Sequence, residues 1–381
     1  MTGRAPPSSA ASLVRPFLKL GTIAFGGPAA HIAMMEDEFV RRAAWLSREQ
    51  FLDLVGASSL IPGPSSTEVA IFVGHRRAGW RGLLVAGCCF ILPAASMVTA
   101  LAWAYVRFGR LPQVGAVLYG VKAVIIAIIV QALVGFARTA IKTKTLLALG
   151  AAAGGATLLG VGPLVVLLAA GFLHAMTAIR LRPAGRSRGM LFLAAATAPG
   201  AWSPALRFSL AKLFLIFLKI GAVVFGSGYV LLAFLRADFV ERTHWLTPGQ
   251  LIDAVAVGQV TPGPVFTTAT FIGYLLAGPL GAVVATVAIF LPSIVLVAVG
   301  GRLIPRLRRS PAAAAFLDGV NVASLALMAI VTAHLARDAL VDLVTASLAA
   351  MGALLLFRFR VGSAWLILAA ACVGAVKWWL V

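Results

Sequence analysis

The sequence predicts an all-α polytopic membrane protein, a bundle of apolar helices built from two related halves. Three observations indicate this fold. The chain of 381 residues is 61% hydrophobic and only 12% charged, with a mean hydropathy of +0.99, whereas soluble domains carry about 25% charged residues. Many apolar stretches reach the roughly 20 residues that a spanning helix needs. A β-barrel would show short alternating segments instead of these long apolar stretches. The first half of the sequence also recurs in the second half.

Two copies of one pattern, offset by 200 residues, run through most of the chain. The stretch FLKLGTIAFGG (17–27) aligns with FLKIGAVVFGS (217–227), and the Pro-Gly-Pro at 62–64 aligns with the one at 262–264. Between 17–64 and 217–264, 18 of 48 positions are identical without a gap. Such repeats are typical of transporters, although a duplication kept for packing alone is the alternative. We expect a first repeat over 1–180, a cytoplasmic linker with an interfacial segment over 181–206, and a second repeat over 207–381.

The charges of the loops predict that the two repeats are inverted in the membrane. The loop 75–81 has three arginines, whereas its counterpart 274–281 has no charge. The next pair reverses, because 107–113 has two arginines and 301–310 has four. Cytoplasmic loops carry the excess of Lys and Arg, so equivalent loops lie on opposite faces.

Each repeat is expected to contain about five spans and one re-entrant segment. The expected first helix covers about 17–35, and later spans lie near 82–106, 113–137, 145–160 and 163–179. The second repeat has spans near 208–235, 282–301, 313–336, 343–357 and 362–380. Inversion requires an odd number of crossings. The Pro-Gly-Pro segment must therefore enter and leave by the same side, as a helical hairpin.

Glycine and proline interrupt four helices inside the apolar region, at FGGP (25–28), at FGSG (225–228) and at both Pro-Gly-Pro turns. Proline removes a backbone donor, and inside lipid the freed groups need partners or a wet cavity. The start of a helix carries unpaired N–H groups that bind oxyanions, so we expect an anion at the bilayer midplane. Close helix packing at the glycines is the alternative. The residues expected to bind the anion are Gly26, Gly27, Ser59, Gly63, Ser65, Ser66, Thr67, Gly226, Ser227, Gln259, Gly263, Thr267 and Thr268.

Ionisable residues inside apolar segments are a second indication of a functional site. Lys19 and Lys219 occupy equivalent positions before the glycine breaks and are expected to attract the anion, unless they extend to the membrane surface instead. The same two alternatives apply to Lys122. Glu68 follows the first Pro-Gly-Pro and is expected to serve coupling or gating, either by carrying a proton or by pairing with Arg76.

Composition and motifs exclude several other classes of protein. The net charge is +20, but the Lys and Arg residues lie mostly in connections between apolar runs, so they indicate membrane orientation rather than nucleic-acid binding. The excess also favours an anionic solute over a cation. The three cysteines lie in apolar runs without histidines at ligand spacing, and no G-x-x-x-x-G-K-[ST] motif is present. We therefore expect no metal, no cofactor and no ATP drive, and we leave a homodimer open.

The motifs resemble those of the chromate ion transporter (CHR) family. The matching stretches are FGGPAAHIAMMEDEFV (25–40), WLSREQFLDL (45–54), PGPSSTEVAIFVGHRRAGWRG (62–82), FGSGYVLLAFLRADFV (225–240) and WLTPGQLIDAVAVGQVTPGPVFTTATFIGY (245–274), together with Pro93. The resemblance covers nearly the whole chain and is to the long, two-domain form. It implies export of chromate from the bacterial cytoplasm across the inner membrane, with sulfate as a similar substrate and the proton gradient or exchange (antiport) as the drive. The sequence departs from the family pattern at Ser59, where Gln is frequent, and at Glu68, where a neutral residue is usual.

Two other functions are open to a chain of this kind. Membrane enzymes that act on lipid phosphates also use re-entrant hairpins, but they need paired carboxylates, or a serine with arginine and histidine, at one site. Glu68 has no second carboxylate near it in the sequence, and His75 falls in a loop. An anion channel is the other alternative.

Overall fold

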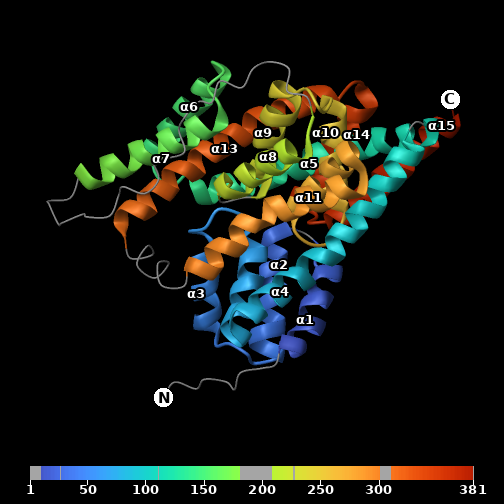
Figure 1. Ribbon diagram of the computed structural model, residues 1–381. Coiled ribbons are helices and arrows are strands. Elements are labelled where there is room, and N and C mark those ends of the chain that lie inside the picture. Colours follow the sequence, from blue (N-terminus) through green and yellow to red (C-terminus); the bar gives the residue numbers. More distant parts are fainter. Residues whose placement is uncertain are drawn as a thin grey trace.

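The computed structural model describes residues 10–25, 27–109, 111–180, 208–225, 228–300 and 310–380, and these residues form helices and connecting turns without a β-strand (Figure 1). Among them, four helical stretches are long and apolar enough to cross a bilayer: Ser65–Phe108, Pro112–Ala140, Val265–Gly300 and Pro311–Ala339. The predicted all-α membrane bundle is therefore confirmed. The expected linker over 181–206 lies outside the described residues.

The first half of the chain begins with a helix that is broken where the glycines predict. Helix α1 (Ala10–Ile23) stops before the FGGP stretch, and α2 (Gly27–Glu36) starts within it and continues into a π-helical turn, Asp37–Arg42. Next comes α3 (Arg48–Ser58), whose start is fixed by a capping box between Ser47 and Gln50. The remaining helices are α4 (Ser65–Phe108), α5 (Pro112–Ala140), α6 (Lys144–Leu158) and α7 (Pro163–Arg180).

The second half follows the same order of elements. Its first helix is broken between α8 (Leu210–Val223) and α9 (Leu231–Leu235), and α10 (Pro248–Val260) begins with a capping box between Thr247 and Gln250. The remaining elements are a 3-10 turn (Val265–Thr267), α11 (Thr268–Gly300), α13 (Pro311–Ala339), α14 (Leu343–Arg358) and α15 (Ser363–Leu380).

Helices α4 and α11 are each bent sharply at a glycine of positive φ. The φ of Gly79 is 59° and that of Gly278 is 63°. The bend in α4 brings the backbones of Gly74 and Gly82 so close that a side chain on either would overlap the carbonyl of the other. We call α3 with the part of α4 before its bend (48–77) the first hairpin, and α10 with the part of α11 before its bend (248–276) the second hairpin.

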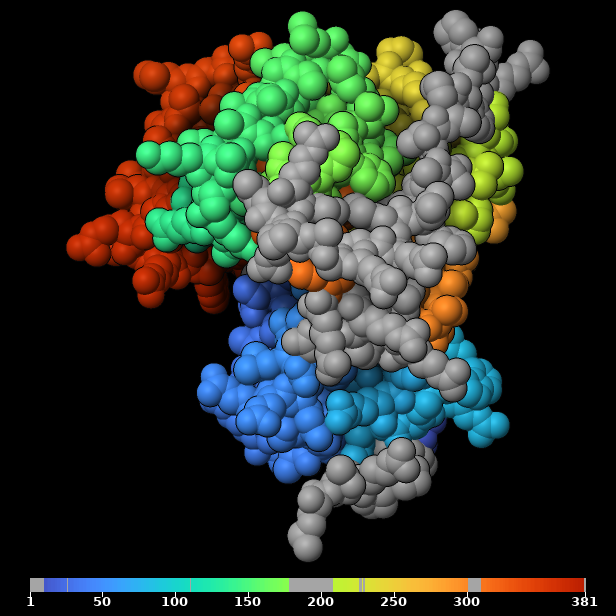
Figure 2. Space-filling model, turned by 90° about the vertical axis from the view of Figure 1, so that its left-hand side faces the viewer, coloured from blue at the N-terminus to red at the C-terminus, as the bar shows by residue number. Residues whose placement is uncertain are grey.

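The helices pack as two groups joined through α4 and α11. Helices α1 to α3 and the first part of α4 gather in one lobe (blue in Figures 1 and 2), with a core of its own that includes Phe17, Phe39 and Phe51. The larger core lies among the C-terminal part of α4 and the helices from α5 onward. Helix α11 packs against both α4 and α8. Large apolar side chains are also exposed on the outside, among them Leu92 and Val299, as expected for a surface that faces lipid.

Candidate functional site

Each Pro-Gly-Pro turn lies against the broken first helix of the other half. The Gly63 N–H donates to the Val224 carbonyl at 2.7 Å, and the Gly263 N–H donates to the Ala24 carbonyl at 2.8 Å. Val224 and Ala24 are the residues that directly follow α8 and α1. The two bonds are equivalent under the 200-residue offset. They satisfy backbone groups that the breaks leave without helical partners, and they bring the four interruptions into one region.

Both turns require glycine at their centre. Gly63 has φ +135° and Gly263 has φ +93°, which side chains rarely tolerate. A Cβ atom on Gly63 would overlap the Ser293 hydroxyl and lie 2.5 Å from Glu68 Oε1. A Cβ atom on Gly263 would lie 2.6 Å from the Cβ of Ala94. The turns are therefore packed against the opposite half with no room for a side chain.

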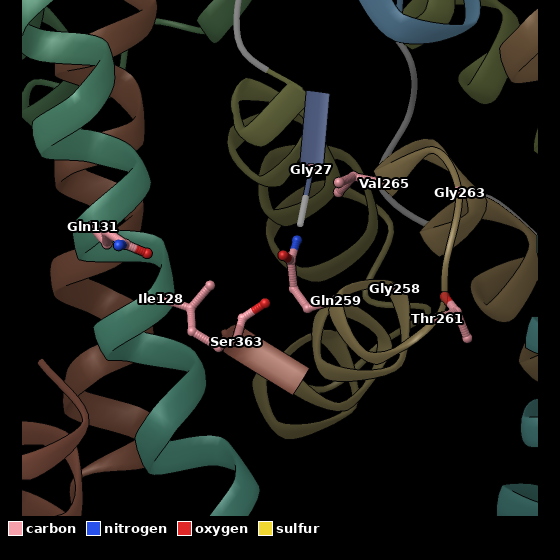
Figure 3. Close-up of a pocket in the computed structure, with 9 residues that line it drawn as sticks. All are labelled: Gly27, Ile128, Gln131, Gly258, Gln259, Thr261, Gly263, Val265 and Ser363. Carbon is pink, nitrogen blue, oxygen red and sulfur yellow. The ribbon is translucent and has the colours of Figure 1, made fainter. Parts of the chain in front are cut away.

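A polar cavity of about 60 Å³ adjoins the second Pro-Gly-Pro turn. This space is several times the roughly 10–15 Å³ that one water molecule requires. Figure 3 shows the Gln259 side chain, at the end of α10, pointing toward Gly27 at the start of α2, while Gln131 approaches from α5. The lining residues are Gly27, Ile128, Gln131, Gly258, Gln259, Thr261, Gly263, Val265 and Ser363.

The lining of this cavity can hold an anion without a charged side chain. Gly27 (φ +79°) begins α2, a helix of 10 residues, and the first N–H groups of a helix have no intrahelical acceptor. These groups and the partial positive charge of a helix start attract oxyanions. The amides of Gln259 and Gln131 and the hydroxyl of Ser363 add hydrogen-bond donors, whereas the Thr261 hydroxyl donates to the Val257 carbonyl.

Three predicted anion-binding residues, Gly27, Gln259 and Gly263, meet at this cavity. Gly63 and Ser66 are buried in the first hairpin instead, where the Ser66 hydroxyl lies 3.2 Å from His31 Nδ1. Gly26, Gly226 and Ser227 lie outside the described residues. Their role in binding stays a prediction.

The other predicted hydroxyls are near the turns but bond mostly within their own helices. The Thr267 hydroxyl donates to the Pro264 carbonyl at 2.9 Å, and that of Thr268 donates to the Val265 carbonyl at 2.8 Å. Ser59 is exposed and donates to the Gly56 carbonyl. Two more hydroxyl residues lie at the start of α4: Ser65, which is half-buried, and Thr67, which is buried.

The predicted basic residues lie away from the cavity lining, in ion pairs or on the surface. Lys19 pairs with Glu38 at 2.8 Å, and Lys219 pairs with Asp238. Arg76 is exposed near the bend of α4. The proposed pairing of Arg76 with Glu68 does not occur among the described ion pairs, because Glu68 is fully buried and bonded to Ser293.

Lys122 belongs to a cluster around the buried carboxylate of Asp253 that joins the two halves. Its Nζ lies 3.0 Å from Oδ1 of Asp253 on α10, and the Tyr105 hydroxyl donates to Asp253 Oδ2 at 2.9 Å. Asp253 is buried, whereas its sequence counterpart Asp53 is exposed. The cluster therefore anchors the second hairpin to α4 and α5.

Sequence reasoning missed His31 and Ser293, both of which are buried next to predicted residues. His31 could have been found by comparing the repeats, since its counterpart is Leu231. Ser293 reaches Glu68 across 225 positions of sequence, and no local pattern reveals that contact.

The fold and this site define a multi-pass helical membrane protein whose interrupted helices surround a small polar cavity, which is the architecture of a carrier for small solutes. The chain belongs to the chromate transporter family: the sequence model of that family, Chromate transporter, matches residues 11–175 and again 211–375. The expected resemblance is thus confirmed, including the long form with two family domains.

Several curated relatives share most of the chain. It is 36% identical over 381 residues to the chromate transport protein of Cupriavidus metallidurans, and the alignment covers 98% of this chain and 94% of the relative. A probable chromate transport protein of Synechococcus elongatus is 34% identical over 89% of this chain and 88% of the relative. The chromate transport protein of Pseudomonas aeruginosa is 32% identical over 87% and 82%, respectively. No solved structure matches the chain significantly.

Proposed function

We propose that this protein exports chromate from the cytoplasm across the inner membrane, with sulfate as a second substrate. The relatives named as chromate transport proteins support the substrate. The observation that carries the proposal is the cavity between the start of α2 and the second Pro-Gly-Pro turn, which offers hydrogen-bond donors to an oxyanion and no carboxylate.

The anion is held in this proposal by the first N–H groups of α2, the Gln259 amide and the hydroxyls around them. The attraction comes from the helix start and from donors fixed in a small cavity. Lys19 and Lys219 would act at longer range, by drawing the anion toward the site from the positions of their ion pairs.

The transport cycle is proposed to use two inverted repeats with re-entrant hairpins. The alternating loop charges support inversion, and the two matches to the family model support the repeat. The reciprocal bonds from Gly63 and Gly263 support a pseudo-symmetric centre, where rocking of one repeat against the other would expose the cavity to each side in turn.

The membrane potential favours export of a dianion from a cytoplasm that is negative inside. Each charge gains about 2.3 kcal/mol per 100 mV, so two charges gain about 4.6 kcal/mol. Coupling to protons remains our hypothesis for additional drive, with Glu68 as the proton carrier and Arg76 as a gating charge.

Transport of labelled chromate into proteoliposomes tests the proposal. We expect saturable uptake that sulfate inhibits more than phosphate or molybdate, and that responds to imposed membrane potentials and pH gradients. Flux that does not saturate and ignores a gradient of unlabelled chromate would favour a channel. Release of phosphate from a lipid pyrophosphate would favour an enzyme, which the described lining, without an ionisable side chain, does not support.

Replacing Gln259 with leucine is expected to raise the half-saturating chromate concentration by roughly 10- to 100-fold, because a hydrogen bond to a charged group contributes about 1.5–3 kcal/mol. Gln113→Leu is the matched control, since Gln113 is exposed at the start of α5 and should bind no substrate. Equal affinities of both variants would remove Gln259 from the site.

A further inference from the structure

The first hairpin and its neighbour α2 contain a buried group of polar side chains, two of them ionisable, whose counterparts in the second repeat cannot ionise. His31, Ser66 and Glu68 are each at most 1% exposed. At the equivalent positions of the second repeat stand Leu231, Phe266 and Thr268. The two repeats share their turns and their breaks, so this difference in chemistry is specific to the first repeat.

Glu68 is the carboxyl group of this set, and it has few partners. The Ser293 hydroxyl lies 3.3 Å from Glu68 Oε1 and also 3.3 Å from the Pro62 carbonyl. Oε2 is buried without a hydrogen-bond partner, and no ion pair among the described residues involves Glu68. A buried carboxylate without a cation costs several kcal/mol, whereas the protonated group is neutral. The site therefore suits a carboxyl group that binds a proton.

His31 links helix α2, whose first residue lines the cavity, to the first hairpin. It lies four residues after Gly27 on α2, a rise of about 6 Å, and Gly27 lines the cavity. Its Nδ1 contacts the Ser66 hydroxyl, while its buried Nε2 has no hydrogen-bond partner. Buried polar side chains thus extend from the cavity edge to the first turn of α4, where Glu68 is located.

The residue that contacts Glu68 from the other repeat, Ser293, also differs from its own counterpart, Ala94. Gly63 packs against Ser293, and in the equivalent contact Gly263 packs against Ala94. Ser293 follows Pro292 as Ala94 follows Pro93. The hydroxyl of Ser293 that contacts Glu68 therefore has the methyl group of Ala94 as its counterpart in the other half.

The other charged and titratable side chains near the first hairpin are exposed, half-buried or paired. Among the described residues, Asp253 on α10 is buried and paired with the half-buried Lys122, Tyr274 on α11 is half-buried, and Glu36 on α2 pairs with Arg48. The remaining charged residues on α1 and α3, all exposed, are Arg15, Lys19, Arg48, Glu49 and Asp53. On α4 itself, His75 and Arg77 are half-buried and Arg76 and Arg81 are exposed.

We propose that Glu68 is a proton-binding site, positioned by Ser293 and connected to the cavity through His31, whose protonation favours binding of the dianion. This inference rests on the proposed function. A negative charge on Glu68 repels a dianion in the cavity, and a bound proton removes that repulsion. By reciprocity, a bound anion must favour the proton to the same extent.

The test measures chromate affinity by anion exchange in proteoliposomes of the full chain at a series of pH values. In the wild type, the half-saturating concentration should rise with pH by up to about tenfold per unit, relative to Glu68→Gln. The Glu68→Gln variant should keep exchange but lose the response of net accumulation to a pH gradient. Glu49→Gln, which removes an exposed carboxylate, should behave as the wild type. An identical pH dependence in Glu68→Gln, or affinity that rises with pH, would overturn the proposal.

A second measurement does not depend on turnover. Chromate added to the purified wild type in weakly buffered detergent should cause proton uptake beyond that seen with Glu68→Gln, a comparison that cancels protonation of chromate itself. Chromate binding with equal proton uptake by both proteins would overturn the role of Glu68 alone. A wild type that binds no chromate at any pH would contradict the proposed function instead.

Discussion

Substitution of Gly63 by alanine is expected to abolish chromate transport. The residue has φ +135°, a conformation that costs a non-glycine residue about 1–3 kcal/mol. The added methyl group would also overlap the Ser293 hydroxyl and lie 2.5 Å from Glu68 Oε1. The turn would have to shift, which would break the bond from the Gly63 N–H to Val224 and separate the two halves at their centre. Chromate accumulation by cells that express each variant at equal membrane abundance measures the effect.

Two other glycines serve as controls for this prediction. Gly263→Ala should have a similar effect, because Gly263 also has a positive φ and its Cβ atom would meet Ala94. Gly135→Ala should leave transport unchanged, since Gly135 lies within α5 with open space where its side chain would be. Normal transport by Gly63→Ala at normal abundance would show that the turn does not have to keep this geometry.

Removal of the Lys122 charge is expected to cause the largest loss of stability. The Lys122→Met variant leaves the buried carboxylate of Asp253 without its cation, with only the Tyr105 hydroxyl as a partner. Breaking one side of a buried ion pair costs about 3–5 kcal/mol of unfolding free energy. The second hairpin should then separate from α4 and α5. A lower midpoint of thermal unfolding in detergent would report this loss.

The chain provides a matched control for the ion pair. Lys142 and Asp318 form a pair at 2.7 Å whose lysine side chain is 57% exposed, so Lys142→Met should cost only about 0–1 kcal/mol. The double variant Lys122→Met/Asp253→Asn should recover much of the lost stability, because no buried charge remains uncompensated. Equal unfolding midpoints for Lys122→Met and Lys142→Met would show that the Asp253 cluster does not hold the hairpin.

Local sequence predicted most of the helices and the places where they break. The span expected near 113–137 is α5 (Pro112–Ala140), and the first helix is interrupted between Ile23 and Gly27, within one turn of the FGGP glycines. These features depend on apolar length, proline and glycine, which act over a few residues. The loss of a backbone donor at proline, for example, needs no tertiary context.

The candidate site was predicted in part. Gly27, Gln259 and Gly263 come together at the cavity, because the breaks that identify them in the sequence also place them at the centre of the fold. Lys19 and Lys219 were expected to attract the anion, and in the structure each pairs with a carboxylate 19 positions later, Glu38 and Asp238. These pairs form only once the chain has turned back on itself, so local sequence does not reveal them.

By itself, the sequence determined that this protein is a helical membrane protein of two related halves with four interrupted helices. Those properties follow from composition and from signals that repeat along the chain. Only the tertiary structure decided which groups meet across the halves: Gly63 with Val224, Ser293 with Glu68, and Lys122 with Asp253. The reason is physical, since such contacts join residues more than 100 positions apart, and their geometry depends on how whole helices pack rather than on any local preference of the chain.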